Sequence, residues 1–557
     1  MRLTKRLAAL AVALTTLAAA GLAFAQGPNP LPADTPWFKP YEEPVTARIG
    51  ASVNIAQTFP EGDSYSHNVW TRGLLEQLNI NVDVVWEAPG GSDYETKLNL
   101  AIASNDLPDI ILTANYAQFM KLYNAGKLAD LTGLYEEYAY PVIQENLMKD
   151  GGQSLSWGVL DGKRMGMPAE GASMQQVRLV WIRADWLEEL GLEEPKTMED
   201  VLSIAKAFKD ADPDNRVGMP FFKAVIGDGM CDIQGVANAY GAFPRIWIDD
   251  GEGGLKYGSI QPEFRKAIEI YADLYKDGYI DPAFASLDGG KVGEQLTTNK
   301  IGVIIGNSWL SSWPLNTLYD TDKVDWHVYP LLMSETIDTP VKTQVPDIKG
   351  AHVVVRAGYE HPELLFKWLN FSVAKTNDPL YAEPYAYHSD PPEIEHGFGY
   401  HMLNPLYVYY NDPMLNFNTQ PHVTAAIDTG DLSSLTTAHD ETQYANVKKW
   451  FDKVEAGEQP SGNDWNAWLS WYGPDSTFAI MNRYIADGSL VYNQTYGYFT
   501  DTMVKEWGSL TSMENEYVTQ IIAGARPIED FDEFVETWLA LGGEDIIKEI
   551  NEWHKAK

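Results

Sequence analysis

Residues 70–113 read WTRGLLEQLNINVDVVWEAPGGSDYETKLNLAIASNDLPDIILT, and the expected fold class follows from them. The spacing of apolar residues predicts a helix over Trp70–Leu78, a strand over Asn81–Trp86, a helix over Tyr94–Ala103 and a strand over Asp109–Thr113. A strand over Ala47–Ala56 precedes them. This alternation predicts an α/β fold, with a parallel sheet covered by helices. Ligands bind such sheets beside the carboxyl ends of the strands, so residues 60–68, 86–93 and 114–118 form a candidate rim.

A second α/β unit is predicted farther along the chain. Its elements are a strand over Val177–Ile182, helices over Met198–Asp210 and Pro262–Lys276, a strand over Ile301–Ile305 and a helix after Trp309. Val353 and Val354 then have the pattern of a strand that returns to the first sheet. We therefore expect two lobes joined by at least two crossings, near residues 165–177 and 331–350.

The remainder of the chain differs in character. Beyond about Asn370 it is rich in aromatic residues and turn signals, and helices are predicted to resume over Asp440–Ala456 and Asp530–Lys555. We expect these residues to form an added subdomain that is helical and loop-rich.

Composition narrows the possible functions. The 557 residues include 78 Asp and Glu against 41 Lys and Arg, a formal net charge of -37 at pH 7. Such a charge repels phosphate backbones and anionic lipid heads, which argues against nucleic-acid and membrane-surface binding. Cys231 is the one cysteine, so the chain cannot form an internal disulfide or a cysteine-based metal site.

Residues 1–25 have the pattern of a secretory signal peptide. Arg2, Lys5 and Arg6 precede an apolar run over Leu7–Ala20, and Ala23-Phe24-Ala25 offers small residues at a cleavage site. No Cys lies at that site, so we expect a periplasmic or secreted protein without a lipid anchor. Residues 26–44 contain six prolines and are predicted to form an extended leader.

Several segments resemble the family 1 extracellular solute-binding proteins that deliver sugars to ABC transporters. The longest is VWIRADWLEELGLEEPKTMEDVLSIAKAFK at 180–209, where the family has a helix start, a Leu-Gly-Leu stop and a Pro-x-Thr cap. Others are LAIASNDLPDII at 100–111, DGKRMGMP at 161–168 and NKIGVIIGNSW at 299–309. The segment at 520–549 is similar to the large, lipoprotein-like oligosaccharide binders of the family.

This resemblance implies a periplasmic-binding-protein-like fold of the class II type, with two α/β lobes and a hinge. The expected division is a signal peptide at 1–25, a leader at 26–44, an N-terminal lobe at 45–168 and 350–400, and a C-terminal lobe with a helical extension at 169–349 and 401–557. The implied function is capture of a small solute, above all an oligosaccharide, for an ABC transporter permease by a monomer that needs no cofactor.

Two other functions are consistent with the same sequence. A peptide or other non-sugar solute could occupy the same architecture, although its cleft would need fixed charges for peptide termini. A secreted glycoside hydrolase or lyase would need two carboxyl groups about 5–10 Å apart. The chain lacks the His-Glu-x-x-His, Gly-x-Ser-x-Gly, P-loop and Rossmann glycine motifs, so we expect no catalytic residues.

Two acidic clusters are candidate metal sites. The first comprises His388, Asp390, Glu393, Glu395 and His396, whose spacing follows no ligand pattern, and we interpret it as a solvated loop. The second is Asp210, Asp212 and Asp214, which match positions 1, 3 and 5 of a calcium loop. The glycine and the closing acid of such a loop are missing, so a turn is the preferred interpretation and no metal is expected.

Sugars offer an apolar face to aromatic rings and hydroxyl groups to polar side chains. In the sugar-binding relatives a Trp stacks on the ligand at the position that Trp309 matches, and Trp313 could extend this platform. The other candidates, each as consistent with packing as with binding, are Trp86, Asn115 and Tyr116 on the rim, Glu170 after the crossover strand, and Trp468 and Trp471. These two share a predicted helix face with Trp465.

Overall fold

The computed structural model describes residues 30–53, 57, 59–90, 92–149, 152–169, 174–345, 351–378, 380–383, 400–408, 410, 412–495 and 498–556. The predicted signal peptide, Glu170 and the acidic cluster at 388–396 lie outside the described residues.

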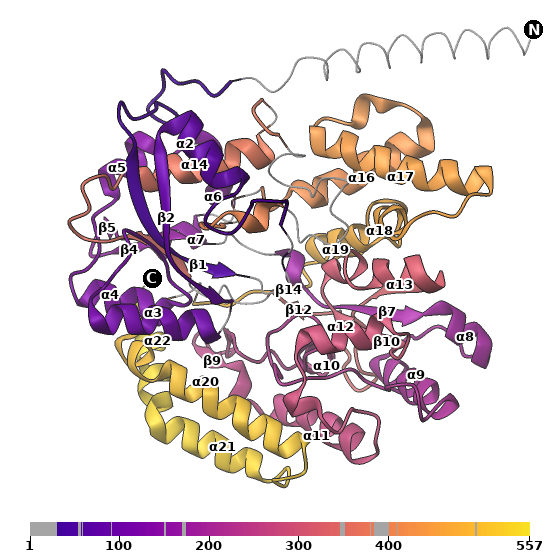
Figure 1. Ribbon diagram of the computed structural model, residues 1–557. Coiled ribbons are helices and arrows are strands. Elements are labelled where there is room, and N and C mark those ends of the chain that lie inside the picture. Colours follow the sequence, from indigo (N-terminus) through magenta and orange to yellow (C-terminus); the bar gives the residue numbers. More distant parts are fainter. Residues whose placement is uncertain are drawn as a thin grey trace, which may run out of the picture.

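The first lobe is built on a five-stranded sheet in the order β2–β1–β3–β13–β6 (Figure 1). β1 pairs in parallel with β2 and β3, while β13 runs antiparallel to β3 and β6. The predicted α/β unit and the return of Val353 and Val354 to the first sheet are therefore confirmed. The prediction of a parallel sheet holds only for β1, β2 and β3, because the returning strand β13 runs antiparallel to both of its neighbours. The elements of this lobe are β1 (Val45–Val53), α2 (Val69–Leu78), β2 (Ile80–Pro89), α3 (Ser92–Ser104), β3 (Ile110–Leu112), α4 (Tyr116–Asn124), α5 (Thr132–Tyr138), α6 (Pro141–Met148), α7 (Gln153–Ser156), β4 (Val159–Leu160), β5 (Lys163–Arg164), β6 (Met167–Pro168), β13 (His352–Val355) and α14 (Leu364–Asn377).

Alternation along the strands divides the apolar residues of this sheet between two cores. Ile110, Val353 and Val355 pack with helices α2, α6 and α14, whereas Ile111 and Val354 pack with α3 and α4 on the opposite face. Successive side chains of a strand point to opposite faces, so these short apolar runs predict a sheet that is covered on both sides.

The second lobe contains a three-stranded sheet in the order β10–β7–β11, with both neighbours antiparallel to β7. All five residues of β7 are buried, because helices cover both faces of the sheet. Its elements are β7 (Leu179–Arg183), α8 (Ala184–Leu190), α9 (Met198–Ala211), α10 (Gln234–Ala239), β8 (Trp247–Asp249), β9 (Leu255–Tyr257), α11 (Pro262–Lys276), α12 (Gly289–Thr297), β10 (Val303–Gly306), α13 (Leu315–Asp322), β11 (Trp326–Pro330) and β12 (Thr343–Gln344).

The segment that most resembles the family folds as its residues dictate. Gly191 ends α8 in the left-handed conformation (φ 64°), which glycine adopts without a steric penalty. Thr197 then caps α9: its hydroxyl accepts the N–H of Asp200, and the Asp200 carboxylate accepts the N–H of Thr197 (3.0 Å). These reciprocal bonds satisfy backbone donors that the first turn of a helix leaves free.

The remaining helices extend the second lobe and reach back to the first. They are α16 (Leu415–Thr429), α17 (Ala438–Ala456), α18 (Gly462–Trp471), α19 (Thr477–Ala486), α20 (Asp501–Ile522), α21 (Asp530–Trp538) and α22 (Glu544–Ala556). In Figure 1 the first four lie above the second lobe, and α20–α22 lie below the first lobe, beside α11 of the second. β14 (Leu490–Val491) pairs with β12, and α20 packs on both α11 and α4.

Two stretches lie closer to the first lobe than the sequence indicates. Phe38, in the predicted leader, is 1% exposed and belongs to the core of this lobe, and the Lys367 ammonium donates to the carbonyl oxygen of Pro36 (3.2 Å). The leader segment from about residue 31 therefore packs on the lobe instead of preceding it as an extended chain. At the other boundary, Leu403, Leu406 and Tyr410 belong to the same core, which thus continues past residue 400.

Candidate functional site

The two sheets turn one end toward each other. In the first sheet, Pro168 at the end of β6 pairs with His352 at the start of β13. In the second sheet, Leu179 at the start of β7 pairs with both Gly306 and Pro330. The chain crosses from Pro168 to Leu179 and from Pro330 to His352, so both crossings join these same ends. The loop after β3 and the turn after β10 therefore lie on the sides through which the lobes are connected.

The turn after β10 carries a pair of nearly parallel indole rings. Trp309 is half-buried, Trp313 is 40% exposed, and their ring centroids lie 6.3 Å apart at an interplanar angle of 21°. Gly293 of α12 lies directly under the Trp313 ring, and a Cβ atom at that position would come within 2.8 Å of it. The two rings thus form a supported apolar surface that remains open to solvent.

Neutral polar groups from three other segments gather beside this turn. The Ser308 hydroxyl donates to the main-chain oxygen of Gln175 in the first crossing (3.0 Å). The Asn416 amide of α16 donates to the side-chain oxygen of Gln175 (2.8 Å), and Nε2 of His439 of α17 lies 3.0 Å from Oδ1 of Asn416. The first bond orients the Asn416 amide, so His439 donates from Nε2 and keeps Nδ1 as an acceptor. Burial lowers the pKa of His439, which favours this neutral imidazole.

A buried ion pair supports the turn from below. Arg178 is 1% exposed and makes two hydrogen bonds to Asp232, at 3.2 and 2.6 Å. Its guanidinium also donates to the side chain of Asn307 (2.5 Å) and to the main-chain oxygen of Gln176 (2.9 Å). The arginine therefore holds together the first crossing and the start of the Trp309 turn. Because Asp232 neutralises its charge, it leaves the site above it without a free cation from this residue.

The rim candidates of the first lobe have structural partners instead. Asn115 caps α4 by accepting the N–H of Gln118 (3.0 Å), and its amide donates to Glu95 (2.9 Å). Tyr116 is 7% exposed and packs on Phe499 at a centroid distance of 4.8 Å, and burial raises its pKa to about 12. These contacts favour packing for both residues.

Trp86 is held in a similar way. Its indole lies across Gly50 of the neighbouring strand, where a Cβ atom would come within 2.1 Å of the ring. The other neighbour is Tyr94 of α3, with ring centroids 5.3 Å apart. Trp86 is therefore half-buried between the sheet and α3, and its position favours packing.

The three tryptophans of α18 do not act as one surface. Trp465 is 1% exposed and lies parallel to Tyr319, and Trp471 is 6% exposed and lies parallel to Phe478. Trp468 is half-buried, stacks on Trp450 at 5.1 Å, and lines a groove beside β11. The first two belong to the core, whereas Trp468 reaches the surface away from Trp309.

The remaining features of the described residues serve structure. At the calcium-loop candidate, Asn215 donates to both carboxylate oxygens of Asp212 (3.0 and 3.2 Å), as in a turn. No group of three or more His, Cys, Asp or Glu that could hold a metal ion occurs in the part of the chain that the structure describes. Within the same residues, none of the helices has the length and apolar character needed to cross a membrane.

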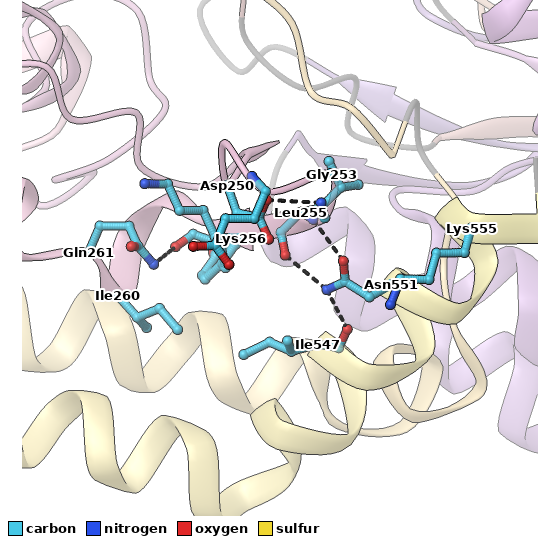
Figure 2. Close-up of a pocket in the computed structure, with 12 residues that line it drawn as sticks. Asp250, Gly253, Leu255, Lys256, Ile260, Gln261, Ile547, Asn551 and Lys555 are labelled. Carbon is cyan, nitrogen blue, oxygen red and sulfur yellow. Dashed lines mark hydrogen bonds between the residues drawn. The ribbon is translucent and has the colours of Figure 1, made fainter.

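A hollow of about 460 Å³ lies between the β8–β9 hairpin and α22, and Figure 2 shows the residues that line it. Asn551 of α22 clamps the hairpin: its side-chain oxygen accepts the N–H of Leu255 (2.7 Å) and its amide donates to the carbonyl of Leu255 (2.9 Å). The Asp250 carboxylate accepts the N–H groups of Glu252 and Gly254 (2.7 and 2.9 Å), which lowers its pKa. These polar groups are engaged in holding the hairpin, so the hollow is a weaker candidate than the Trp309 turn.

Comparison with known proteins agrees with this architecture. Residues 58–377 match the family model of the bacterial extracellular solute-binding proteins, and the chain belongs to this family. It is similar to the lipoprotein LipO of Bacillus subtilis (strain 168), with 22% identity over 503 residues that cover 87% of this chain and 88% of LipO. It is also similar to the fructooligosaccharide ABC transporter substrate-binding protein FusA of Streptococcus pneumoniae serotype 4, with 25% identity over 298 residues, 51% of this chain and 54% of FusA. Among solved structures, the alginate-binding protein AlgQ2 superimposes with a TM-score of 0.62 at 16% identity, over 92% of this chain and 99% of AlgQ2, which shows the shared fold.

Proposed function

We propose that this protein is the exported substrate-binding protein of an ABC importer, and that it holds a neutral oligosaccharide between its lobes for delivery to a membrane permease. The observation that carries the proposal is the Trp309–Trp313 ring pair, which lies at the end of the second sheet from which both crossings depart. Flat indole surfaces bind the apolar C–H faces of sugar rings, and a parallel pair offers room for successive rings.

The polar groups around the pair support a neutral ligand. Gln175, Asn416 and His439 offer amide and imidazole groups, which suit sugar hydroxyls. The nearby charge of Arg178 is already paired with Asp232, so it does not serve a ligand carboxylate. A peptide terminus or a uronic acid would require such a charge, and we therefore favour neutral sugars over both.

Export and partner follow from family membership together with the sequence. The signal-peptide pattern of residues 1–25 supports secretion to the periplasm or the medium. FusA is by name an ABC transporter substrate-binding protein, which supports a permease as the partner of this chain. Binding proteins release their ligand unchanged, so we propose no bond chemistry.

A thermal-shift screen tests the ligand class. The protein is heated with neutral oligosaccharides (nystose, maltopentaose, xylopentaose and cellopentaose), with trigalacturonate and with a tripeptide. A ligand at a hundred times its Kd stabilises the native state by about 2.7 kcal/mol, which raises the Tm. We expect such a rise in Tm with at least one neutral sugar. Stabilisation by the uronate or the peptide alone would contradict the proposal.

Two controls complete the test. The stabilising sugar is recovered by chromatography after prolonged incubation, and shortened products would reveal a hydrolase or lyase. Trp553→Ala serves as the matched variant for Trp309→Ala, since Trp553 is also half-buried and stacked, against Tyr498 at 4.5 Å. Trp553→Ala should keep the sugar-induced rise in Tm, and Trp309→Ala should lose most of it.

A further inference from the structure

A groove of about 530 Å³ lies along β11, on the second lobe. β11 is one edge strand of the three-stranded sheet, and β10, which leads to the Trp309 turn, is the other edge. The groove runs beside residues 327–330 and is closed on its other side by the end of α18 and the start of α19. It is therefore separate from the turn that carries Trp309.

Three aromatic side chains line this groove, and neighbouring side chains hold two of them in place. Trp468 has one face covered by Trp450, whose ring lies parallel to it at 5.1 Å and 14°. The Tyr472 ring packs edge-on against Phe451 (4.9 Å), and its hydroxyl donates to Asp428 (2.8 Å). Tyr329 comes from β11 itself. Rings fixed before a ligand arrives lose little conformational entropy on binding.

The charged groups at the rim already have partners. His327 lies 3.6 Å from both Glu194 and Asp325, and the hydrogen bond and charge of Asp325 raise the pKa of its imidazole. Asp475 lies 3.9 Å from Arg483. None of the described residues that line the groove is Lys or Arg, and the imidazole of His327, where the raised pKa favours a positive charge, already faces Glu194 and Asp325. The lining therefore matches a neutral ligand that has both apolar faces and hydroxyl groups.

We propose that this groove is a second, external binding site for a neutral saccharide, with Trp468, Tyr472 and Tyr329 as its ring-contacting residues. Glu194, His327 and Asp475 accept or donate hydrogen bonds to sugar hydroxyls at the rim. The volume lies in the ordinary range of small-molecule sites, and the groove is partly open to solvent, so a longer glycan can extend beyond it. Such a site raises the local concentration of a glycan near the lobes without taking part in their closure.

Fluorine NMR of the protein labelled with 5-fluorotryptophan tests this site directly. The signals of Trp468 and Trp309 are assigned by their loss in Trp468→Leu and Trp309→Phe variants. During titration with maltopentaose, xylopentaose, cellopentaose or nystose, we expect the Trp468 signal to shift with its own saturation curve, with a Kd on the order of 1 mM. This saturation curve should persist in Trp309→Ala. In Tyr329→Leu, which keeps apolar volume but removes the flat ring, its Kd should rise roughly tenfold.

The outcomes separate this proposal from the main function. A Trp468 signal that does not move with any of the four sugars, or that moves only with trigalacturonate, with choline chloride or with a basic peptide, would overturn the external site. A Trp468 curve that disappears in Trp309→Ala would also overturn it, because both signals would then report one site. If the proposed sugar site between the lobes is wrong, the Trp309 signal should not shift with any sugar. Unfolding curves confirm that Tyr329→Leu is folded, and Trp553→Ala is the control for changes that are not local.

Discussion

The loop after β3 and the turn after β10 occupy equivalent places, since each follows a strand at the end of a sheet from which the crossings depart. After β3, Asn115 caps a helix and Tyr116 is enclosed by Phe499 and its neighbours. After β10, Trp309 and Trp313 keep open ring surfaces and are supported by Arg178 and Gly293. The difference teaches that a position beside a strand end makes a residue available for a site only when capping and packing do not already use it.

The largest effect should follow from removing the support beneath the turn. Arg178→Met leaves the Asp232 carboxylate buried without its counter-ion, which typically costs about 3–5 kcal/mol of unfolding free energy. Urea unfolding measures this loss. Arg483→Met is the matched control, because its pair with Asp475 is exposed, and such pairs contribute less than about 1 kcal/mol. Equal losses in the two variants would show that Arg178 is not a special support.

Trp309→Ala should separate binding from stability. We expect the affinity for the best sugar to fall by about 2 kcal/mol, roughly thirtyfold, because an aromatic contact surface is lost. If the ring belongs to the core, the variant instead loses about 3–5 kcal/mol of unfolding free energy with its affinity intact. Calorimetric titration beside thermal unfolding distinguishes these results. A loss of stability with intact affinity would mean that the turn after β10, like the loop after β3, serves packing.

The polar side of the turn should respond to pH. His439 has a pKa lowered by burial, so its neutral form is favoured in the folded protein and Nδ1 can accept a hydrogen bond from a sugar hydroxyl at neutral pH. Affinity should be constant above the ordinary pKa of histidine and should fall as the pH drops through the lowered value. His439→Leu should cost about 1 kcal/mol of affinity, roughly fivefold, and should abolish this pH dependence. A wild-type affinity that does not change with pH would argue against contact between His439 and the sugar.

Asn115→Ala should affect only folding. It removes a helix cap, which typically costs about 1 kcal/mol of unfolding free energy, and the sugar affinity should stay within error of wild type. Titration of this variant beside Trp309→Ala is the sharpest test of the contrast between the two strand ends. A tenfold loss of affinity would show that Asn115, in the loop after β3, contributes to the binding site.

The smallest effect is expected at Cys231. Its side chain is 3% exposed and burial raises the pKa of the thiol well above its ordinary value, so it is a poor nucleophile. Cys231→Ser should bind sugar as well as wild type with modest destabilisation, and the native thiol should resist alkylation by iodoacetamide at pH 8. Rapid alkylation would mean that the core around Cys231 opens readily.

Much of the fold is predictable because it depends on local patterns. The helix over Pro262–Lys276 has the predicted limits, and the strand over 109–113 differs by a residue at each end. The single helix expected over Asp530–Lys555 is wrong, because Leu541 and Gly542 leave helical geometry and divide it into α21 and α22. Local patterns also do not predict that the second sheet is antiparallel, because β10 and β11 pair with β7 across long stretches of chain.

The site was less accessible to such reasoning. Trp309 was identified because the resemblance assigned a role to its position, and that role stays a prediction. Sequence patterns do not predict the cluster of Gln175, Asn416 and His439, because the three side chains meet only after distant segments fold together and none belongs to a motif. For Asn115 and Tyr116, sequence alone does not reveal that a cap and a distant Phe499 engage them.

The helix α20, which packs on α4 of the first lobe and α11 of the second, has a mechanical consequence. Together with Phe499 against Tyr116, it links the two lobes at a place other than the two crossings. Wide separation of the lobes would break these contacts, so we expect a motion that keeps them. The radius of gyration measured by X-ray scattering should therefore change little when sugar is added, even where binding is tight.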